Sequence, residues 1–209
     1  MRTRRPHVIL RLGSERRDEA VDVLVEAFRD YPAMRFMLGP ESTGPERLSI
    51  LIGSYVDGRL ARGGPVLGIE RGGELAAIAL VDEPVPASQP NIVERASVAV
   101  RDRLGEATWR RIEAFENAVA GLEPDEPHHY IGMLGVRDRY RGEGLARRLV
   151  DDIAQQAIDD PDSRSVCLST ESVENLALYA RLGFEVIGET RIESLQSWTL
   201  SRVKSDCTG

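Results

Sequence analysis

Cysteine and histidine are scarce in this chain of 209 residues, which limits the chemistry it can perform. The two cysteines, Cys167 and Cys207, give no disulfide framework. Cys167 lies in an apolar run, which favours a place in the core, and neither cysteine stands with a histidine in an arrangement typical of a nucleophile. The cysteines and the histidines His7, His128 and His129 also lack the spacing of a metal site. We therefore predict neither a metal site nor a cysteine nucleophile.

Long apolar runs are also absent. No run approaches the roughly 20 residues that a membrane-spanning helix needs, and the basic residues 1–5 are not followed by the apolar segment of a signal peptide. The net charge of -7 and the lack of an interleaved basic and aromatic surface disfavour nucleic-acid binding. We expect a cytoplasmic protein, monomer or homodimer, without a membrane or nucleic-acid partner.

The remaining composition, 42% hydrophobic and 29% charged residues, is that of an ordinary globular protein. The length and the absence of an interdomain linker predict one domain over residues 1–209, with a flexible tail from about residue 203. Apolar and alternating runs predict strands at 7–12, 66–70, 74–81, 129–136, 165–170, 184–190 and 195–202. Helical spacing predicts helices between Ser14 and Pro32, at 45–60, at 92–120 with a break near Gly105, at 143–158 and at 174–182.

These elements imply a fold of the α/β class (α+β mixed), with one mixed sheet of about six to seven strands and helices on both faces. The strands at 129–136 and 165–170 are joined through a helix, so they are expected to run parallel with a right-handed crossover.

A glycine-rich turn, residues 141–146, stands between the strand at 129–136 and the helix at 143–158. Such a turn leaves backbone N–H groups free at a helix N-terminus, where partial positive charge suits a phosphate or pyrophosphate. Glycine also lets an anion approach the backbone closely. Many strand–helix turns use glycine only to make the turn, so this spacing alone leaves both interpretations open.

Arginine is concentrated around this turn, although the whole chain is acidic. A local excess of one charge indicates a specific anionic ligand, whereas a solvated helix face explains the last two arginines of the group equally well. The group consists of Arg137, Arg139, Arg141, Arg147 and Arg148.

A second cluster lies downstream, at residues 174–184. It predicts a short helix that carries Asn175 and Tyr179, ends at Gly183 and leads into a strand at Phe184. A tyrosine in this position is either a core residue or a hydroxyl offered to a ligand.

The two clusters together resemble the GNAT superfamily of acyl-CoA-dependent N-acetyltransferases. The pyrophosphate loop of that family has an Arg or Gln, two residues, a Gly, one residue and a Gly or Ala, as residues 141–146 do. Its later helix carries the pattern N-x-x-x-Y-x-x-x-G-F, which Asn175, Tyr179, Gly183 and Phe184 match. Segments at 27–35, 134–136 and 197–202 further resemble the puromycin N-acetyltransferase group within that superfamily.

This resemblance implies a splayed central sheet, acetyl-CoA as the cofactor and a small-molecule primary amine, antibiotic-like or a metabolite, as the acceptor. The main chain around Leu134, Gly135 and Val136 is expected to pair with the pantetheine arm. The rest of the implied cofactor site comprises Arg139, Arg141, Gly142, Glu143, Gly144, Leu145, Ala146 and Asn175. For Asn175, a helix-capping role is the alternative.

The resemblance also implies the catalytic groups. Tyr179 corresponds to the family tyrosine that acts as general acid toward the leaving thiolate. Related sequences often read Leu-Glu-Thr at the end of the strand, where this chain has Ser169, so Glu171, two positions later, becomes the candidate base. His128, His129 and a water chain without a single base are the alternatives.

The acceptor site is implied by where this superfamily builds its acceptor cleft. We expect it to include Tyr31, Met34, Phe36, His129 and Trp198, although such residues are often part of the core. Two other functions stay open: a non-catalytic acyl-CoA-binding or regulatory domain, suggested by Ser169, and an acetyltransferase acting on a protein N-terminus or lysine.

Overall fold

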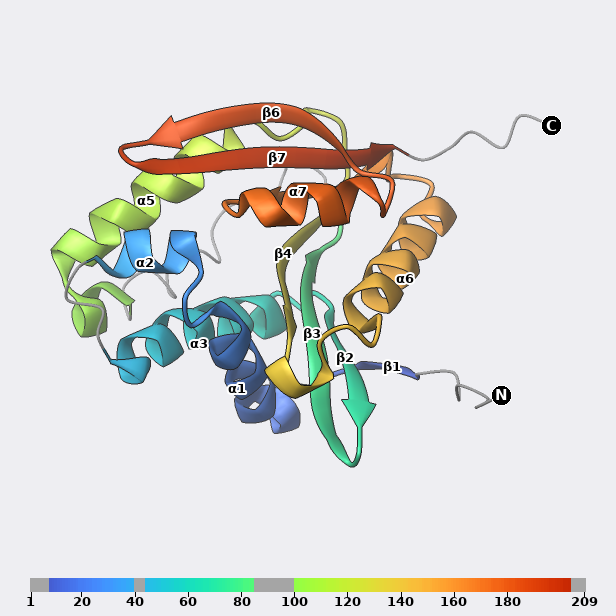
Figure 1. The fold of residues 1–209 in the computed structure, drawn as a ribbon, viewed down its shortest axis with the longest axis horizontal. Helices are drawn as coiled ribbons and strands as arrows, with labels where there is room; N and C mark the ends of the chain where they lie inside the picture. Colours follow the sequence, from blue (N-terminus) through green and yellow to red (C-terminus); the bar gives the residue numbers. More distant parts are fainter. Residues whose placement is uncertain (1–7, 40–43, 85–99, 204–209) are drawn as a thin grey trace.

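The computed structural model describes residues 8–39, 44–84 and 100–203. Its strands form one seven-stranded sheet in the order β1-β2-β3-β4-β5-β7-β6 (Figure 1). Only β4 and β5 pair in parallel; the other neighbours are antiparallel. The strands are β1 (Ile9–Arg11), β2 (Val66–Arg71), β3 (Glu74–Asp82), β4 (His129–Val136), β5 (Ser165–Thr170), β6 (Glu185–Ile192) and β7 (Leu195–Val203).

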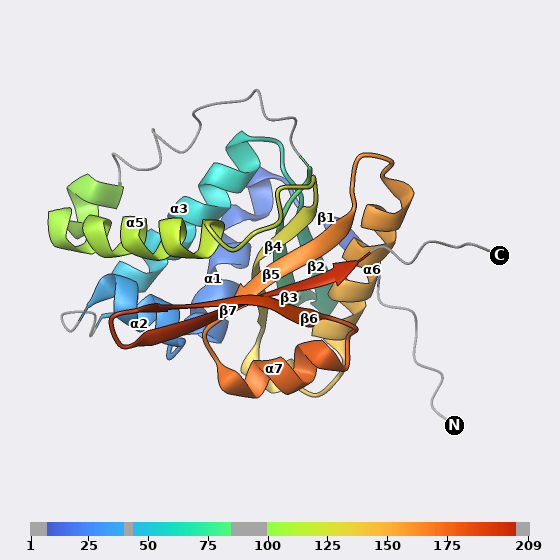
Figure 2. The ribbon, with the colours of Figure 1, turned by 90° about the horizontal axis from the view of Figure 1, so that it is seen from above.

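Helices cover both faces of the sheet (Figures 1 and 2). One face of β3 and β4 packs against α1, and α3 also contacts β3, while α6 packs on the opposite face. The helices are α1 (Arg17–Phe28), α2 (Pro32–Leu38), α3 (Pro45–Ala61), α5 (Glu106–Ala120), α6 (Leu145–Asp159) and α7 (Val173–Ala180). The predicted helical stretch at 92–99 and the tail after residue 203 lie outside the described residues.

Strand β3 divides the core into two layers. Its residues 75–81 are all buried. Ile78 and Leu80 join the apolar cluster beneath α1 and α3, whereas Ala77 and Ala79 join the cluster beneath α6. This alternation follows from the two-residue period of a strand. The burial of both faces holds β3, and with it the neighbouring β4, firmly in the centre of the sheet.

Strand β4 separates from β5 after a short stretch of pairing. The two strands pair only at residues 129–131, where Ile131 faces Leu168. Along β3, Leu80 faces Met133 and Val81 faces Ile131, so Gly132 is the extra residue of a β-bulge. A bulge bends its strand and increases the local twist. Residues 132–136 therefore continue beside β3 without pairing to β5, within the described part of the chain.

The structure confirms the mixed fold, the seven strands, the parallel pair and the splay implied by the resemblance. Helix α2 is absent from the predicted elements, because Pro32 indicates the end of a helix in the sequence. In the structure Pro32 begins α2, where the missing N–H costs no hydrogen bond. None of the helices within residues 8–39, 44–84 and 100–203 is long and apolar enough to cross a bilayer.

Candidate active site

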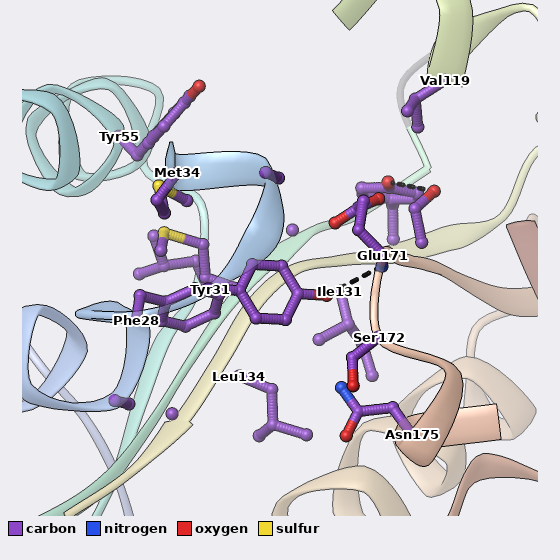
Figure 3. Close-up of a pocket in the computed structure, with 18 of the residues that line it drawn as sticks. Phe28, Tyr31, Met34, Tyr55, Val119, Ile131, Leu134, Glu171, Ser172 and Asn175 are labelled. Carbon is purple, nitrogen blue, oxygen red and sulfur yellow. Dashed lines mark hydrogen bonds between the residues drawn. The ribbon is translucent and has the colours of Figure 1, made fainter. Parts of the chain in front are cut away.

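A cavity of about 1660 Å³ opens where β4 and β5 separate. It has two parts, which we name by the helices beside them. The α6 arm is lined by residues 141, 142 and 144–147 before and within α6 and by residues of α7, among them Asn175 and Tyr179. The α2 arm is lined by residues of α2, α3 and α5, among them Tyr31, Met34 and Tyr55 (Figure 3).

The start of α6 offers free backbone amides to the α6 arm. Gly142 and Gly144 have φ angles of 78° and 83°, which favour glycine. Gly144 is the N-cap residue, and no side chain caps the helix by a hydrogen bond. The first N–H groups of a helix have no partner within it, and α6 carries no acidic residue in its first turn. This end of α6 is thus suited to an anion, as the glycine turn indicates.

Not every residue of the predicted loop faces the cavity. Arg141, Gly142, Gly144, Leu145 and Ala146 line it. The guanidinium of Arg141 is 2.9 Å from an Asp138 carboxylate oxygen and is largely exposed, so its charge lies at the cavity edge.

Arg139 and Glu143 are outside the lining, because both side chains are engaged elsewhere. Arg139 pairs with Glu74 and lies over the Tyr140 ring. Glu143 accepts a hydrogen bond of 2.8 Å from Arg71. These two predicted positions are therefore not brought into the cavity, because Arg71 of β2 and Glu74 of β3 hold the two side chains in ion pairs outside it.

The unpaired edge of β4 runs along the same cavity. Leu134, Gly135 and Val136 line it, as predicted. At Gly135 a Cβ atom would lie 2.9 Å from the Cβ of Ala27, so glycine lets α1 pack directly on the strand. The backbone of β4 is consequently held from one side by β3 and α1 and is left available on the side of the cavity.

Glu171 follows the last residue of β5 and lies buried in the cavity wall. The Ser197 hydroxyl donates a 2.7 Å hydrogen bond to Glu171 Oε1, and the Glu171 amide donates to the Tyr31 hydroxyl at 3.0 Å (Figure 3). Burial raises the pKa of the Glu171 carboxyl above its ordinary value, and the hydrogen bonds offset this only in part. Such a carboxylate is a stronger base than an exposed one.

Tyr179 stands on α7 and is 8% exposed. Its ring packs edge-to-face on Phe184 at 5.8 Å. Burial, followed by the charge of Glu171, raises its pKa to about 12. No described residue forms a hydrogen bond with its hydroxyl, which lines the cavity and is free to donate to a ligand.

Thr170 links the two arms of the cavity. Its hydroxyl is 3.0 Å from the Tyr31 hydroxyl and accepts a 3.1 Å hydrogen bond from Asn175 Nδ2. Asn175 lies in the first turn of α7 and lines the cavity. Its amide is thus oriented by Thr170 at the end of β5.

Three predicted acceptor residues lie outside the cavity lining. Phe36 packs against the cluster beneath α1 and α3. Trp198 packs against the other cluster, because it occupies the opposite face of β7 from Ser197. His129 is buried, with Nδ1 3.0 Å from the Ser163 hydroxyl, and burial lowers its pKa. Tyr31 and Met34 alone of the five expected acceptor residues line the cavity.

His128 lines the cavity but is committed to another contact. Its Nε2 is 3.3 Å from Glu123, and this hydrogen bond raises its pKa. Its Nδ1 is 2.8 Å from the Glu126 carbonyl oxygen, so both ring nitrogens are engaged within the chain.

Several cavity residues carry no signal in the sequence. Tyr55 occupies the apolar face of the helix predicted at 45–60, and this position predicts a core residue. Glu116 lies on α5 and Ser197 inside β7, far along the chain from the residues that they contact. Tyr130 reaches Ser169 across the paired part of β4 and β5. Only the three-dimensional fold brings these groups together.

Comparison with known proteins agrees with the resemblance found in the sequence. A family model described as an acetyltransferase (GNAT) domain matches residues 111–199. A Corynebacterium glutamicum structure, described as histone acetyltransferase HPA2 and related acetyltransferase, superposes with a TM-score of 0.72 at 22% identity, covering 97% of this chain and 99% of that one.

Two structures from insects share the fold as well. Arylalkylamine N-acetyltransferase 2 from Aedes aegypti has a TM-score of 0.67 at 15% identity, covering 95% of this chain and 99% of its own. Polyamine N-acetyltransferase from Drosophila melanogaster, which forms N-acetylagmatine, has a TM-score of 0.62 at 17% identity, covering 94% and 99%. The chain therefore has the GNAT fold, and its residues 111–199 match the model of an acetyltransferase (GNAT) domain, in agreement with its two motifs.

Proposed function

We propose that this protein transfers the acetyl group of acetyl-CoA to a primary amine of a small molecule. One observation carries the proposal: a single cavity joins the free amides at the start of α6, the unpaired edge of β4, and the side chains of Tyr179 and Glu171.

The α6 arm fits coenzyme A in charge and shape. The amides of residues 142–146 would hold the diphosphate, with Arg141 adding positive charge. The edge of residues 132–136 would pair with the extended pantetheine arm as an added strand does. Asn175 would donate to the same arm. Acetyl-CoA supplies an activated acetyl thioester, and an amide N–H of β4 would stabilise negative charge that develops on its oxygen.

Glu171 and Tyr179 divide the proton transfers between them. Glu171 accepts a proton from the ammonium form of the acceptor, which frees the nitrogen lone pair for attack; the C–N bond forms as the C–S bond breaks, and the nitrogen then loses a second proton to solvent. Tyr179 donates to the departing sulfur. Because the pKa of Tyr179 is about 12 and that of a free thiol about 8.5, the hydroxyl stays protonated at neutral pH and acts mainly through its hydrogen bond to sulfur.

The α2 arm supports a small amine as the acceptor. Aromatic side chains of Phe28, Tyr31 and Tyr55 line it, in the manner of a pocket for a compact molecule. Two neighbours in fold are named for amines, arylalkylamines in one case and polyamines in the other. The resemblance to the puromycin N-acetyltransferase group adds antibiotic-like amines to this class.

A thiol-release assay with acetyl-CoA tests the proposal against a panel of alkylamines, arylalkylamines, diamines and short peptides. We expect turnover with small amines, and a decrease in kcat of about 100-fold in Tyr179→Phe, the usual contribution of a general acid. Tyr140→Phe is the control, because that hydroxyl also borders the cavity but bonds Glu74.

Binding of coenzyme A, measured by calorimetry, separates the other functions. Tight binding without turnover of any acceptor would show a non-catalytic acyl-CoA-binding domain. Turnover of peptides alone would show a protein acetyltransferase.

A further inference from the structure

Two carboxylates in the cavity wall lack a cationic partner among the described residues, and one of them is buried while the other is half-buried. They are Glu171 and Glu116. The other carboxylates of the lining are paired with Arg or His, as are Glu26, Asp30, Asp82, Glu83, Glu123 and Asp138, or are exposed to solvent, as are Asp125, Glu126 and Glu174. Within the described residues, no Lys, Arg or His forms an ion pair with Glu116 or Glu171.

Glu116 is held by a single hydrogen bond. The Tyr55 hydroxyl donates to Glu116 Oε1 at 3.1 Å and lies 3.6 Å from the sulfur of Met37. The second carboxylate oxygen has no partner among the described residues. Burial is the main cause that raises the pKa of Glu116, and the hydrogen bond from Tyr55 opposes it. A negative charge in this position therefore needs a cation that the chain itself does not provide.

The two carboxylates lie at opposite ends of α2. Tyr31, just before α2, contacts the Glu171 amide, whereas Met37, near its end, contacts the Tyr55 hydroxyl beside Glu116. Six residues of helix span about 9 Å. Figure 3 shows Tyr55 and Glu171 on either side of Met34 and Tyr31. The two contact points on α2, residues 31 and 37, are thus about 9 Å apart along the helix axis.

The wall between these ends is apolar. Met34 and Tyr31 line it from α2, and Ile112 lines it from α5. An apolar wall between two carboxylates is complementary to a hydrocarbon body with a positive charge at each end. Arg59 and Arg62 of this arm share one carboxylate, that of Asp82, and neither forms an ion pair with Glu116.

We propose that Glu116 and Tyr55 form a binding site for a second cationic group of the acceptor, whose reacting amine lies at Glu171. The ligand class is a diamine, or an amine with another cationic group, in which an apolar chain separates the two charges. This inference rests on the proposed function, since it places the reacting amine at the catalytic carboxylate.

The test compares α,ω-diamines with monoalkylamines of equal length in the thiol-release assay. The wild-type protein is expected to favour diamines, with an optimum at an intermediate chain length. Glu116→Gln keeps the shape and an oxygen for Tyr55 but removes the charge. It should lower kcat/KM for the best diamine by about 10- to 100-fold, the range for a hydrogen bond to a charged group, and leave the monoamine unchanged.

Glu113→Gln is the matched control, because Glu113 lies one turn away on α5, is exposed and does not line the cavity. It should change neither substrate. Equal loss for diamine and monoamine in Glu116→Gln would show a structural role and overturn the inference. So would a wild-type protein that does not prefer diamines.

Calorimetric titration of the best-fitting diamine into the protein with coenzyme A bound separates this inference from the proposed function. If diamine binding depends on Glu116 while no amine is acetylated, the cation site stands and the proposed function fails. If monoamines are acetylated and diamine binding is unaffected in Glu116→Gln, the proposed function stands and the cation site fails.

Discussion

At the scale of single residues, Ser197 sets how readily Glu171 takes a proton. Its hydroxyl donates to the carboxylate at 2.7 Å and favours the charged form, which opposes the effect of burial. In Ser197→Ala this bond is lost, so the pKa of Glu171 should rise further. Because the base must be deprotonated to act, the acidic limb of the pH profile of kcat/KM should move to higher pH.

Ser201→Ala is the control for this measurement. Ser201 is also buried and lies on β7, four residues from Ser197, but it forms no hydrogen bond with Glu171. It should leave the acidic limb in place. An acidic limb that stays unchanged in Ser197→Ala would mean that another group provides the base.

At the scale of elements, the proposed function assigns the diphosphate of coenzyme A to the start of α6. Gly144→Ala places a side chain at a φ angle of 83°, which costs about 1 kcal/mol of folding free energy. Its Cβ would meet no atom within 4 Å, so the effect is conformational. The strained backbone should misdirect the amides and raise the Kd for coenzyme A by about tenfold, as losing one hydrogen bond to a charged group does.

Gly105→Ala is a comparison, because Gly105 is the N-cap of α5, has a φ angle of 86° and has open space around it, although its ψ of 159° makes alanine more costly there than at Gly144, where ψ is 14°. Urea denaturation should show a loss of stability in both variants, larger in Gly105→Ala, while calorimetry shows weaker coenzyme A binding only in Gly144→Ala. Equal affinity in the two variants would contradict a role of the α6 start in binding.

The elements also show which features the sequence can predict. The turn before α6 is local, because glycines, arginines and helix start are consecutive, so its position follows from the pattern. The contact of Tyr31 with Thr170 spans 139 positions, and no local pattern predicts it. The bulge at Gly132 depends on the register between β3 and β4. Trp198 and His129 point away from the cavity for the same reason, since a strand's register decides which face each residue takes.

At the scale of the whole molecule, the cavity is possible because the sheet does not close. Two apolar clusters hold the sheet from its two faces, while β4 and β5 part between them. The stable layers keep the catalytic groups in place, and the gap admits ligands from both arms. The same gap lowers the stability of the fold, because it leaves the carboxylates of Glu116 and Glu171 in a poorly solvated wall without a cationic partner.

That loss gives a prediction for stability against pH. Burial raises the pKa of Glu116 in the folded state, so the folded protein binds its proton more tightly than the unfolded chain. Stability from this group is therefore present below its unfolded pKa of about 4.3 and is lost as pH rises through the raised folded value. Glu116→Gln, which has no charge, should increase the free energy of unfolding at pH 7 by up to about 1 kcal/mol.

Urea denaturation at pH 7 and at pH 4 measures this effect. The gain in Glu116→Gln should shrink at pH 4, where the carboxyl is mostly protonated in the folded state and the wild type has lost most of the penalty. Glu113→Gln, exposed on the same helix, should have a much smaller effect, because the charge of Glu113 is the smallest of the causes that shift the Glu116 pKa. A loss of stability in Glu116→Gln of equal size at both pH values would show that packing and the Tyr55 hydrogen bond, and not an unpaired charge, govern this position. An added diamine should stabilise the wild type more than the variant at pH 7, because it supplies the missing cation only where the carboxylate is present.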